Sequence, residues 1–171
     1  GRIKSIEDIS IRMSLGADKV TINTKAFEDP EFITAAAKKF GKQAIVVSVD
    51  YKLNNKGDYK VYIDRGNIET SLGPVEWVKE AENRGAGEIL LNSIDFDGKA
   101  SGYNINVIKN VVSESSIPII ACGGVGDYKH FRGGIVDGGA SAVAAGNIFH
   151  FKELSYPLAK RFLKKEGLNF R

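Results

Sequence analysis

Three carboxylates in this chain stand where apolar runs end, a place suited to acid–base chemistry. Asp50 closes the run IVVSVD, and Asp95 and Asp97 close ILLNSIDFD before a glycine. A carboxylate at the end of a buried strand can transfer a proton if burial or a neighbouring charge raises its pKa. Capping of backbone amides is the alternative role for all three. That alternative is weaker for Asp50, because an acid beside four apolar residues is costly to bury.

Glycine-rich segments after other apolar runs are suited to binding phosphate. Backbone N–H groups next to glycine can approach an anion closely, above all where a helix begins. One candidate combines residues 123–126, with the sequence GGVG, and the pair Gly146 and Asn147. Tight turns without any ligand are the alternative explanation for these glycines.

A second candidate phosphate site matches the first, because residues 1–24 align with residues 123–147. In this alignment Gly1 takes the place of Gly123, and Asn23 with Thr24 ends the repeat. An internal repeat of this kind indicates a parent fold made of two similar halves. It predicts a ligand with two phosphates, one bound by each half. The alternative is that all βα units look somewhat alike.

Composition argues against several other classes of function. His130 and His150 have no second ligand at metal-binding spacing, so neither a metal site nor a cofactor is predicted. The single Cys122 is predicted to be a small core residue, and its isolation fits a reducing cytoplasm. The net charge of +3 comes from Lys and Arg dispersed among acids, which predicts no nucleic-acid surface. No apolar run approaches the ~20 residues of a membrane span, and no signal peptide is predicted.

Short apolar runs alternate with helical patterns along the chain. The runs are rich in Val and Ile without strict alternation, as in parallel strands buried on both faces, and they lie at 19–23, 44–49, 88–93, 117–122 and 141–146. The helices between them have recognisable caps, including Ser5 with Asp8, Asn104 and Asp127. The segment 51–67 alternates around NNKGD and predicts a β-hairpin inserted in a long loop.

Five parallel strands fit either a doubly wound sheet or a (β/α)8 barrel. A doubly wound sheet gathers its site at one switch point, whereas a barrel builds its site from the ends of all its strands. In this chain polar residues follow every strand, which favours the barrel. Gly1 aligns with a glycine that follows a strand, and an eight-stranded barrel needs at least ~200 residues. We therefore expect residues 1–171 to form a single α/β domain, an incomplete TIM-type barrel of about five parallel strands without the first three βα units. Its open edges and apolar interior face predict self-association.

The chain resembles a known family along its whole length. The segments that carry the resemblance are GADKVTINT, VVSVDYK, GAGEILLNSIDFDG, SGYN, IPIIACGGVG, GNIFHF and a closing EGLNFR. They are similar to the cyclase subunit of imidazole glycerol phosphate synthase, a (β/α)8 barrel of histidine biosynthesis with two phosphate sites. The resemblance implies a glutaminase partner that supplies ammonia. It also implies conversion of a linear bisphosphorylated ribonucleotide into imidazole glycerol phosphate and aminoimidazole-carboxamide ribonucleotide.

Carried over position by position, the resemblance implies a role for individual residues. Asp50 matches one of two catalytic aspartates, a general acid/base, and the other lies on a first strand that these residues do not include. The residues that would bind substrate and phosphate are Asn23, Thr24, Asp97, Gly98, Gly123, Gly124, Gly146 and Asn147. Lys19 and Glu88, both at strand starts, match a charged ring where ammonia enters. Asp18 matches an acid that faces the glutaminase.

Several positions depart from the family pattern: Arg2, Asn92, Lys99, Ala100, Asn104 and Asn147. Together with the segment AAGNIFHF, these departures point toward a sister branch that serves a sugar amidotransferase in surface-polysaccharide synthesis. The alternative function is therefore a non-catalytic or ammonia-channelling barrel. Since only one of the two catalytic aspartates is present, we expect the isolated 171 residues to have negligible cyclase activity.

Overall fold

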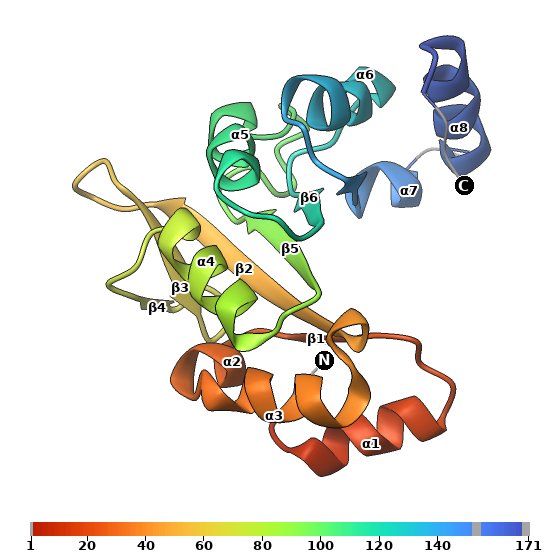
Figure 1. Ribbon diagram of the computed structural model, residues 1–171. Coiled ribbons are helices and arrows are strands. Elements are labelled where there is room, and N and C mark those ends of the chain that lie inside the picture. The colour runs from red at the N-terminus through yellow and green to blue at the C-terminus, as the bar shows by residue number, and fades with distance from the viewer. Residues whose placement is uncertain (1, 152–154, 169–171) are drawn as a thin grey trace.

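A parallel β-sheet whose strand order follows the chain organises the molecule. The structure is a computed structural model that describes residues 2–151 and 155–168. The parallel strands are β1 (Val20–Ile22), β2 (Ile45–Leu53), β5 (Glu88–Ser93), β6 (Ile119–Cys122) and β7 (Ala142–Val143). Each pairs with the next in that sequence, with no reversal of order. Figure 1 shows the long β2 running through the middle of the molecule, with β5 and β6 beside it.

Helices connect the parallel strands. Before β2 lie α1 (Ile6–Ser14), α2 (Thr24–Glu28), α3 (Glu31–Phe40) and the short 3-10 helix η1 (Lys42–Ala44). After β2 come α4 (Pro74–Arg84), α5 (Ile105–Ser113), α6 (Tyr128–Arg132), the π-helical turn η2 (Gly133–Asp137), α7 (Asn147–Phe151) and α8 (Ser155–Lys165). The described helices thus alternate with the parallel strands, as the sequence pattern predicts for an α/β fold.

The caps predicted at Ser5 with Asp8 and at Asn104 form where the sequence places them. Ser5 and Asp8 exchange hydrogen bonds in a capping box, with Asp8 N donating to Ser5 Oγ at 3.1 Å and Ser5 N donating to Asp8 Oδ2 at 3.0 Å. Asn104 Oδ1 accepts from Val107 N at the start of α5. These side chains satisfy backbone donors that the first turn of a helix leaves unpaired.

One face of the sheet packs against the helices and forms the core. Val47 and Val49 of β2 and Ile89 and Leu91 of β5 are almost fully buried. They join one apolar cluster with helix residues that include Ile33, Trp77, Val78, Ala81, Ile108 and Val111. Each such side chain contributes about 1.5–3 kcal/mol of burial free energy, so this face supplies the main stabilisation of the sheet.

The opposite face of the sheet is only half-buried, which corrects one expectation. The strands were expected to be buried on both faces, yet burial alternates along β5 and β6, and Leu90 and Ile120 remain partly accessible. The reason is that, within the described residues, the helices pack on the other face. Asp50, Asn92 and Cys122, near the carboxyl ends of three neighbouring strands, project from this half-buried face.

A β-hairpin extends the sheet after β2. The strand β3 (Tyr59–Ile63) pairs antiparallel with β2, from Asp50 opposite Tyr62 to Leu53 opposite Tyr59, and β4 (Ile68–Glu69) pairs with β3. Asn54 Oδ1 accepts from Lys56 N and Asp58 N and closes the turn. The first arm of this hairpin is the end of β2 itself, which runs to residue 53 rather than stopping at 49, because β3 offers it a partner.

The last parallel strand is shorter than predicted. A strand over 141–146 was expected, but β7 covers only Ala142 and Val143. Among the described strands only β6 pairs with it. A strand with one neighbour makes half of the possible ladder hydrogen bonds, which accounts for its early end.

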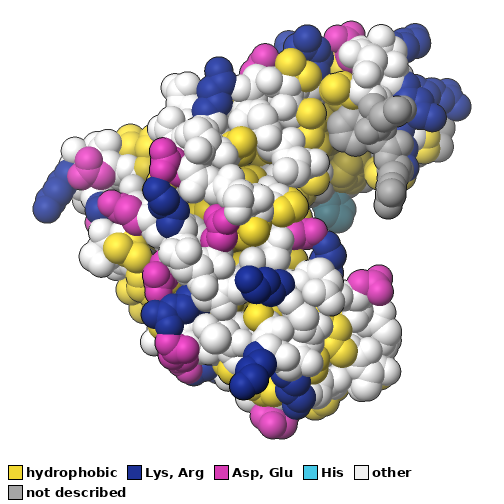
Figure 2. Space-filling view, viewed as in Figure 1, with side chains coloured by type: hydrophobic (Ala, Val, Ile, Leu, Met, Phe, Trp, Pro, Cys, Tyr) yellow, Lys and Arg dark blue, Asp and Glu magenta, His cyan; other side chains and the backbone are white. Residues whose placement is uncertain are grey.

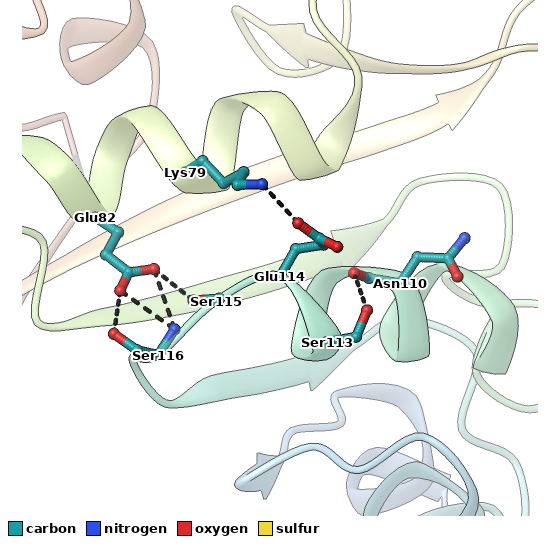
Figure 3. A network of polar contacts seen from close by, with 7 residues as sticks. All are labelled: Lys79, Glu82, Asn110, Ser113, Glu114, Ser115 and Ser116. Carbon is teal, nitrogen blue, oxygen red and sulfur yellow. Dashed lines mark hydrogen bonds and ion pairs between the residues drawn. The ribbon is translucent and has the colours of Figure 1, made fainter.

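Polar contacts tie α4 to the segment that leads into β6 (Figure 3). The carboxylate of Glu82 accepts from the backbone N–H of Ser116 and from the hydroxyls of Ser115 and Ser116. Lys79, one helical turn earlier, pairs with Glu114. These contacts hold the start of β6 against its neighbouring βα unit. They lie at the opposite end of the sheet from Asp50 and Asp97.

The surface carries mixed charge on the face that Figure 2 shows. Side chains of Lys and Arg alternate there with Asp and Glu, and a notch opens between the N-terminal and C-terminal parts of the chain. No single-sign patch covers this face, in keeping with the mild net charge. Within residues 2–151 and 155–168, no helix has both the length and the apolar character needed to cross a bilayer.

Candidate functional site

A row of polar side chains crosses the half-buried face at the carboxyl ends of the strands. Asp50 on β2 is the register partner of Asn92 on β5, which in turn is the register partner of Cys122 on β6. Register partners on adjacent strands project from the same face at the same level. The row therefore places a carboxylate, an amide and a thiol side by side.

Asp50 is held by two hydrogen bonds and partly removed from water. Its Oδ1 accepts from Asn92 Nδ2 at 3.1 Å and from Ser48 Oγ at 3.2 Å. Burial raises the pKa of Asp50 above its ordinary value, and the nearby charge of Asp97 raises it further, while the two hydrogen bonds oppose this rise. A carboxyl group tuned upward in this way can hold a proton nearer neutral pH, as a general acid/base requires.

Asn23 and Thr24 lie at the same edge of the sheet, just after β1. Asn23 Nδ2 donates to the carbonyl oxygen of Ser48 at 3.1 Å, so this amide is fixed against β2 close to Asp50. Thr24 Oγ1 donates to Asn23 Oδ1 and accepts from the backbone N–H of Asp64 at 3.0 Å. The two side chains are thus positioned by both β2 and the hairpin.

The loops after β5 and β6 pack tightly against each other through glycine. Gly124 has φ +108°, and Gly102 N donates to its carbonyl oxygen at 2.8 Å. A Cβ added to Gly124 would lie 2.0 Å from the carbonyl oxygen of Gly102, and one added to Gly123 would lie 2.5 Å from that of Ser93. Only glycine permits this approach of two backbones.

The loop after β5 also meets the start of α7. A Cβ added to Gly98, where φ is +77°, would lie 3.7 Å from Asn147 Nδ2. Asp97, one residue earlier, is near enough to raise the pKa of both Asp50 and Cys122. The structure therefore brings Gly98 and Asn147 together, and it places Asp97, the residue before Gly98, within electrostatic reach of Asp50. Around Gly146 the space is open, with no heavy atom within 4 Å of an added Cβ.

Lys19 and Glu88 form an ion pair at the opposite end of the strands. Glu88 is the first residue of β5 and Lys19 directly precedes β1. Asp18 is exposed next to them. The charged residues expected at strand starts are thus separated from Asp50 by the length of the sheet.

Comparisons with known proteins match this arrangement to one family. The family model described as "Histidine biosynthesis protein" matches residues 1–155. The imidazole glycerol phosphate synthase subunit HisF from each of two strains of Leptospira biflexa serovar Patoc is 44% identical over 172 aligned residues. The alignment covers 100% of this chain and 68% of each relative. This chain belongs to the histidine biosynthesis protein family.

Family membership bears on the two functions that the sequence left open. The relatives described above carry the name of the synthase subunit, and they give no support to the barrel of a sugar amidotransferase. The resemblance to the cyclase subunit is confirmed at the level of the family.

Two residues of this histidine biosynthesis protein differ from expectation. Cys122 was expected in the core, but it is half-buried in the polar row, because odd and even positions of β6 face opposite sides of the sheet. Burial and the nearby carboxylates raise the pKa of its thiol, which makes a reactive thiolate unfavourable. Asp95 accepts from Leu53 N at 2.6 Å, so it caps the hairpin, as the alternative for the loop acids proposed.

Sequence reasoning missed the contacts made by Ser48 and Asn92. Ser48 precedes Asp50 by two residues, so the period of a strand places both on one face. That signal was available in the sequence. The pairing of Asn92 with Asp50 depends on the register between β2 and β5, which lie about 40 residues apart, and no local pattern fixes such a register. No cluster of three metal-binding side chains occurs in the part of the chain that the structure describes.

Proposed function

We propose that this protein is the cyclase subunit of an imidazole glycerol phosphate synthase, an ammonia-dependent lyase of histidine biosynthesis. Its substrate would be a linear bisphosphorylated aminoimidazole-carboxamide ribonucleotide. The observation that carries the proposal is the position of Asp50. In the order of the strands this half-buried carboxylate stands between Asn23 and Thr24 on one side and the glycine loops after β5 and β6 on the other.

In this proposal the two anion sites hold the ends of the substrate and Asp50 acts between them. One phosphate lies at Asn23 and Thr24, whose side chains offer N–H and O–H donors. The other lies at the backbone amides of Gly98, Gly123, Gly124 and Gly146, next to Asn147. Asp50 then moves protons as a general acid/base, and Asp97 contacts the substrate beside it. Fixing both ends limits the reacting part to one orientation, which lowers the entropic barrier.

The fold that this proposal requires is a (β/α)8 barrel. Five parallel strands in unbroken chain order, with helices between them, support a singly wound barrel, since doubly wound sheets reverse their order at a switch point. We propose that residues 1–171 contribute one domain with five strands of such a barrel. Its catalytic rim would be the carboxyl end of the strands, where Asp50 lies.

The partner in this proposal is a glutaminase subunit that supplies ammonia. It would bind at the end of the sheet where Asp18 is exposed, with the pair Lys19 and Glu88 as the entry for ammonia. The separation of this end from Asp50 supports the arrangement, because ammonia would then travel through the protein rather than through solvent. A cytoplasmic location follows from the same proposal.

The direct test is product formation by the complete gene product. With the bisphosphorylated ribonucleotide and ammonium, we expect two products in equal amounts, imidazole glycerol phosphate and aminoimidazole-carboxamide ribonucleotide, separated by chromatography. Substrate that binds but stays unchanged with ammonium, and also with a glutaminase subunit and glutamine, would contradict the cyclase function.

Phosphate binding can be tested on the 171 residues alone. Titration with inorganic phosphate to tens of millimolar is expected to shift the backbone amide resonances of Gly98, Gly124 and Gly146, because these N–H groups face the proposed anion. Gly16 is a matched control, since its φ is also positive and it lies at the far end of β1. Equal shifts at Gly16 and at the three site glycines would mean only a general salt effect.

Self-association is a further proposal about the 171-residue chain. β1 and β7 each pair with one neighbour among the described strands, and the half-buried face includes Leu90 and Ile120. Unpaired strand edges and apolar surface favour association between copies. Light scattering at tens of micromolar is therefore expected to give a mass of at least twice 18.6 kDa. A mass equal to that of one chain would exclude this.

A further inference from the structure

The hydrogen bonds of Asp50 are asymmetric. Both donors, Asn92 Nδ2 at 3.1 Å and Ser48 Oγ at 3.2 Å, contact the same oxygen, Oδ1. Among the described residues, no hydrogen bond or ion pair reaches Oδ2. The two oxygens of this carboxylate are thus chemically different in the folded chain.

This asymmetry decides where a proton binds. An oxygen that accepts two hydrogen bonds carries more of the negative charge, and adding a proton to it would break one of them. Protonation therefore occurs at Oδ2, which keeps both hydrogen bonds at Oδ1 intact. The oxygen without a partner in the protein is the one that can exchange its proton with a ligand.

Asn92 is the more constrained of the two donors. It comes from a different strand than Asp50, and the register of β2 with β5 sets it directly opposite. Its own Oδ1 faces the start of the glycine loop, 3.3 Å from the position that a Cβ on Gly123 would occupy. Asn92 therefore lies between Asp50 and Gly123, and rotation of its amide is limited on both sides.

We propose that Asn92 is a positioning residue that fixes Asp50 through Oδ1 and so makes Oδ2 the oxygen that transfers the proton. This inference rests on the proposed function of Asp50 as a general acid/base. In the acid direction the Oδ2–H bond breaks, its electron pair stays on the carboxylate, and the proton bonds to a basic atom of the substrate. In the base direction Oδ2 takes the proton back, so no other reactant is needed.

Other titratable groups near Asp50 must be considered in a pH experiment. Asp97 approaches from the loop after β5, and Cys122 lies beyond Asn92 on β6. Tyr62 on β3 is the other register partner of Asp50, but its hydroxyl donates to Glu69, which raises its pKa to about 12. Lys52, also on this face, lies over the Tyr62 ring. Of these groups, Asp97 is the carboxylate whose charge acts directly on Asp50, so its resonance must be followed separately.

The test is the Asn92→Ala substitution, read by carboxyl carbon resonances in the 171-residue chain. Loss of a donor to the charged form is expected to raise the pKa of Asp50. Asn92→Thr, which restores a donor of smaller size, is expected to return the pKa toward that of the parent chain. Ser48→Ala removes the other donor to Oδ1 and should also raise the pKa of Asp50. Asn110→Ala, on the exposed side of α5, is the matched control without effect.

A second measurement uses the complete gene product with substrate and ammonium. Asn92→Ala is expected to lower kcat about 10-fold at pH 7 and to move the acidic limb of the pH profile upward, with KM changed little. An unchanged pKa of Asp50 in both Asn92→Ala and Ser48→Ala would overturn the inference, as would a fall in kcat with an unmoved pH profile. If the pKa moves but Asp50→Asn keeps full turnover, the proposed function fails and the hydrogen-bond assignment stands.

Discussion

Replacing Asp50 by asparagine in the complete gene product is expected to lower ammonia-dependent turnover by about 10³-fold. The amide oxygen can still accept from Asn92 and Ser48, so the geometry of the site is retained. The amide cannot carry the proton, so the acid/base step is lost. Steady-state rates with saturating ammonium measure the effect without any contribution from a glutaminase.

The same substitution is expected to increase the stability of the chain at pH 7. Burial raises the pKa of Asp50, so the folded state binds a proton more tightly than the unfolded state, where the pKa is about 3.9. The ionised group therefore costs stability as the pH rises through the folded pKa, and below about pH 3.9 that cost vanishes. Urea unfolding should show Asp50→Asn more stable at pH 7 and equal to the parent chain at low pH.

A loss of activity together with a gain in stability separates a functional role from a structural one. Replacing a residue that serves only packing would lower both the activity and the stability of the protein. Asp58→Asn, at an exposed acid in the hairpin turn, is the control and should leave turnover and stability unchanged. Turnover of Asp50→Asn above about a tenth of the parent rate would remove Asp50 from the acid/base step, given the usual size of such contributions.

The approximate positions of the parallel strands could be predicted from the sequence, because each depends on local composition. Runs of Val and Ile between capped helices are short-range signals. All five predicted runs start within two residues of the observed strands, and all but those of β2 and β7 also end within two residues. The acids at strand ends follow from the same pattern. Asp50 and Asp97 could be placed at one edge because parallel strands all end there.

Contacts between strands could not be predicted in the same way. The extension of β2 to Leu53 depends on its pairing with β3, and the row from Asp50 to Cys122 depends on two registers between distant segments. Whether the sheet is buried on one face or on both depends on where the helices pack, and the apolar runs of the sequence do not encode this. These features arise from tertiary packing, which overrides the local preference of a strand.

Gly124→Ala is expected to destabilise the chain by about 3 kcal/mol or more, one of the largest effects of a single methyl group in this protein. At φ +108° an alanine costs about 1–2 kcal/mol in backbone strain alone. The added Cβ would also stand 2.0 Å from the carbonyl oxygen of Gly102, a contact that the backbone must relieve by moving. Such a movement would break the 2.8 Å hydrogen bond from Gly102 N to Gly124 O.

Gly16→Ala separates the two parts of this effect. Gly16 has a similar φ of +96°, but no heavy atom lies within 4 Å of an added Cβ. Its substitution should therefore cost only the strain, about 1 kcal/mol, in the same urea unfolding experiment. The difference between the two variants measures the close packing of the loops after β5 and β6. If Gly124→Ala costs no more than Gly16→Ala, the two loops are free to separate, and the anion site that they are proposed to form together has no rigid frame.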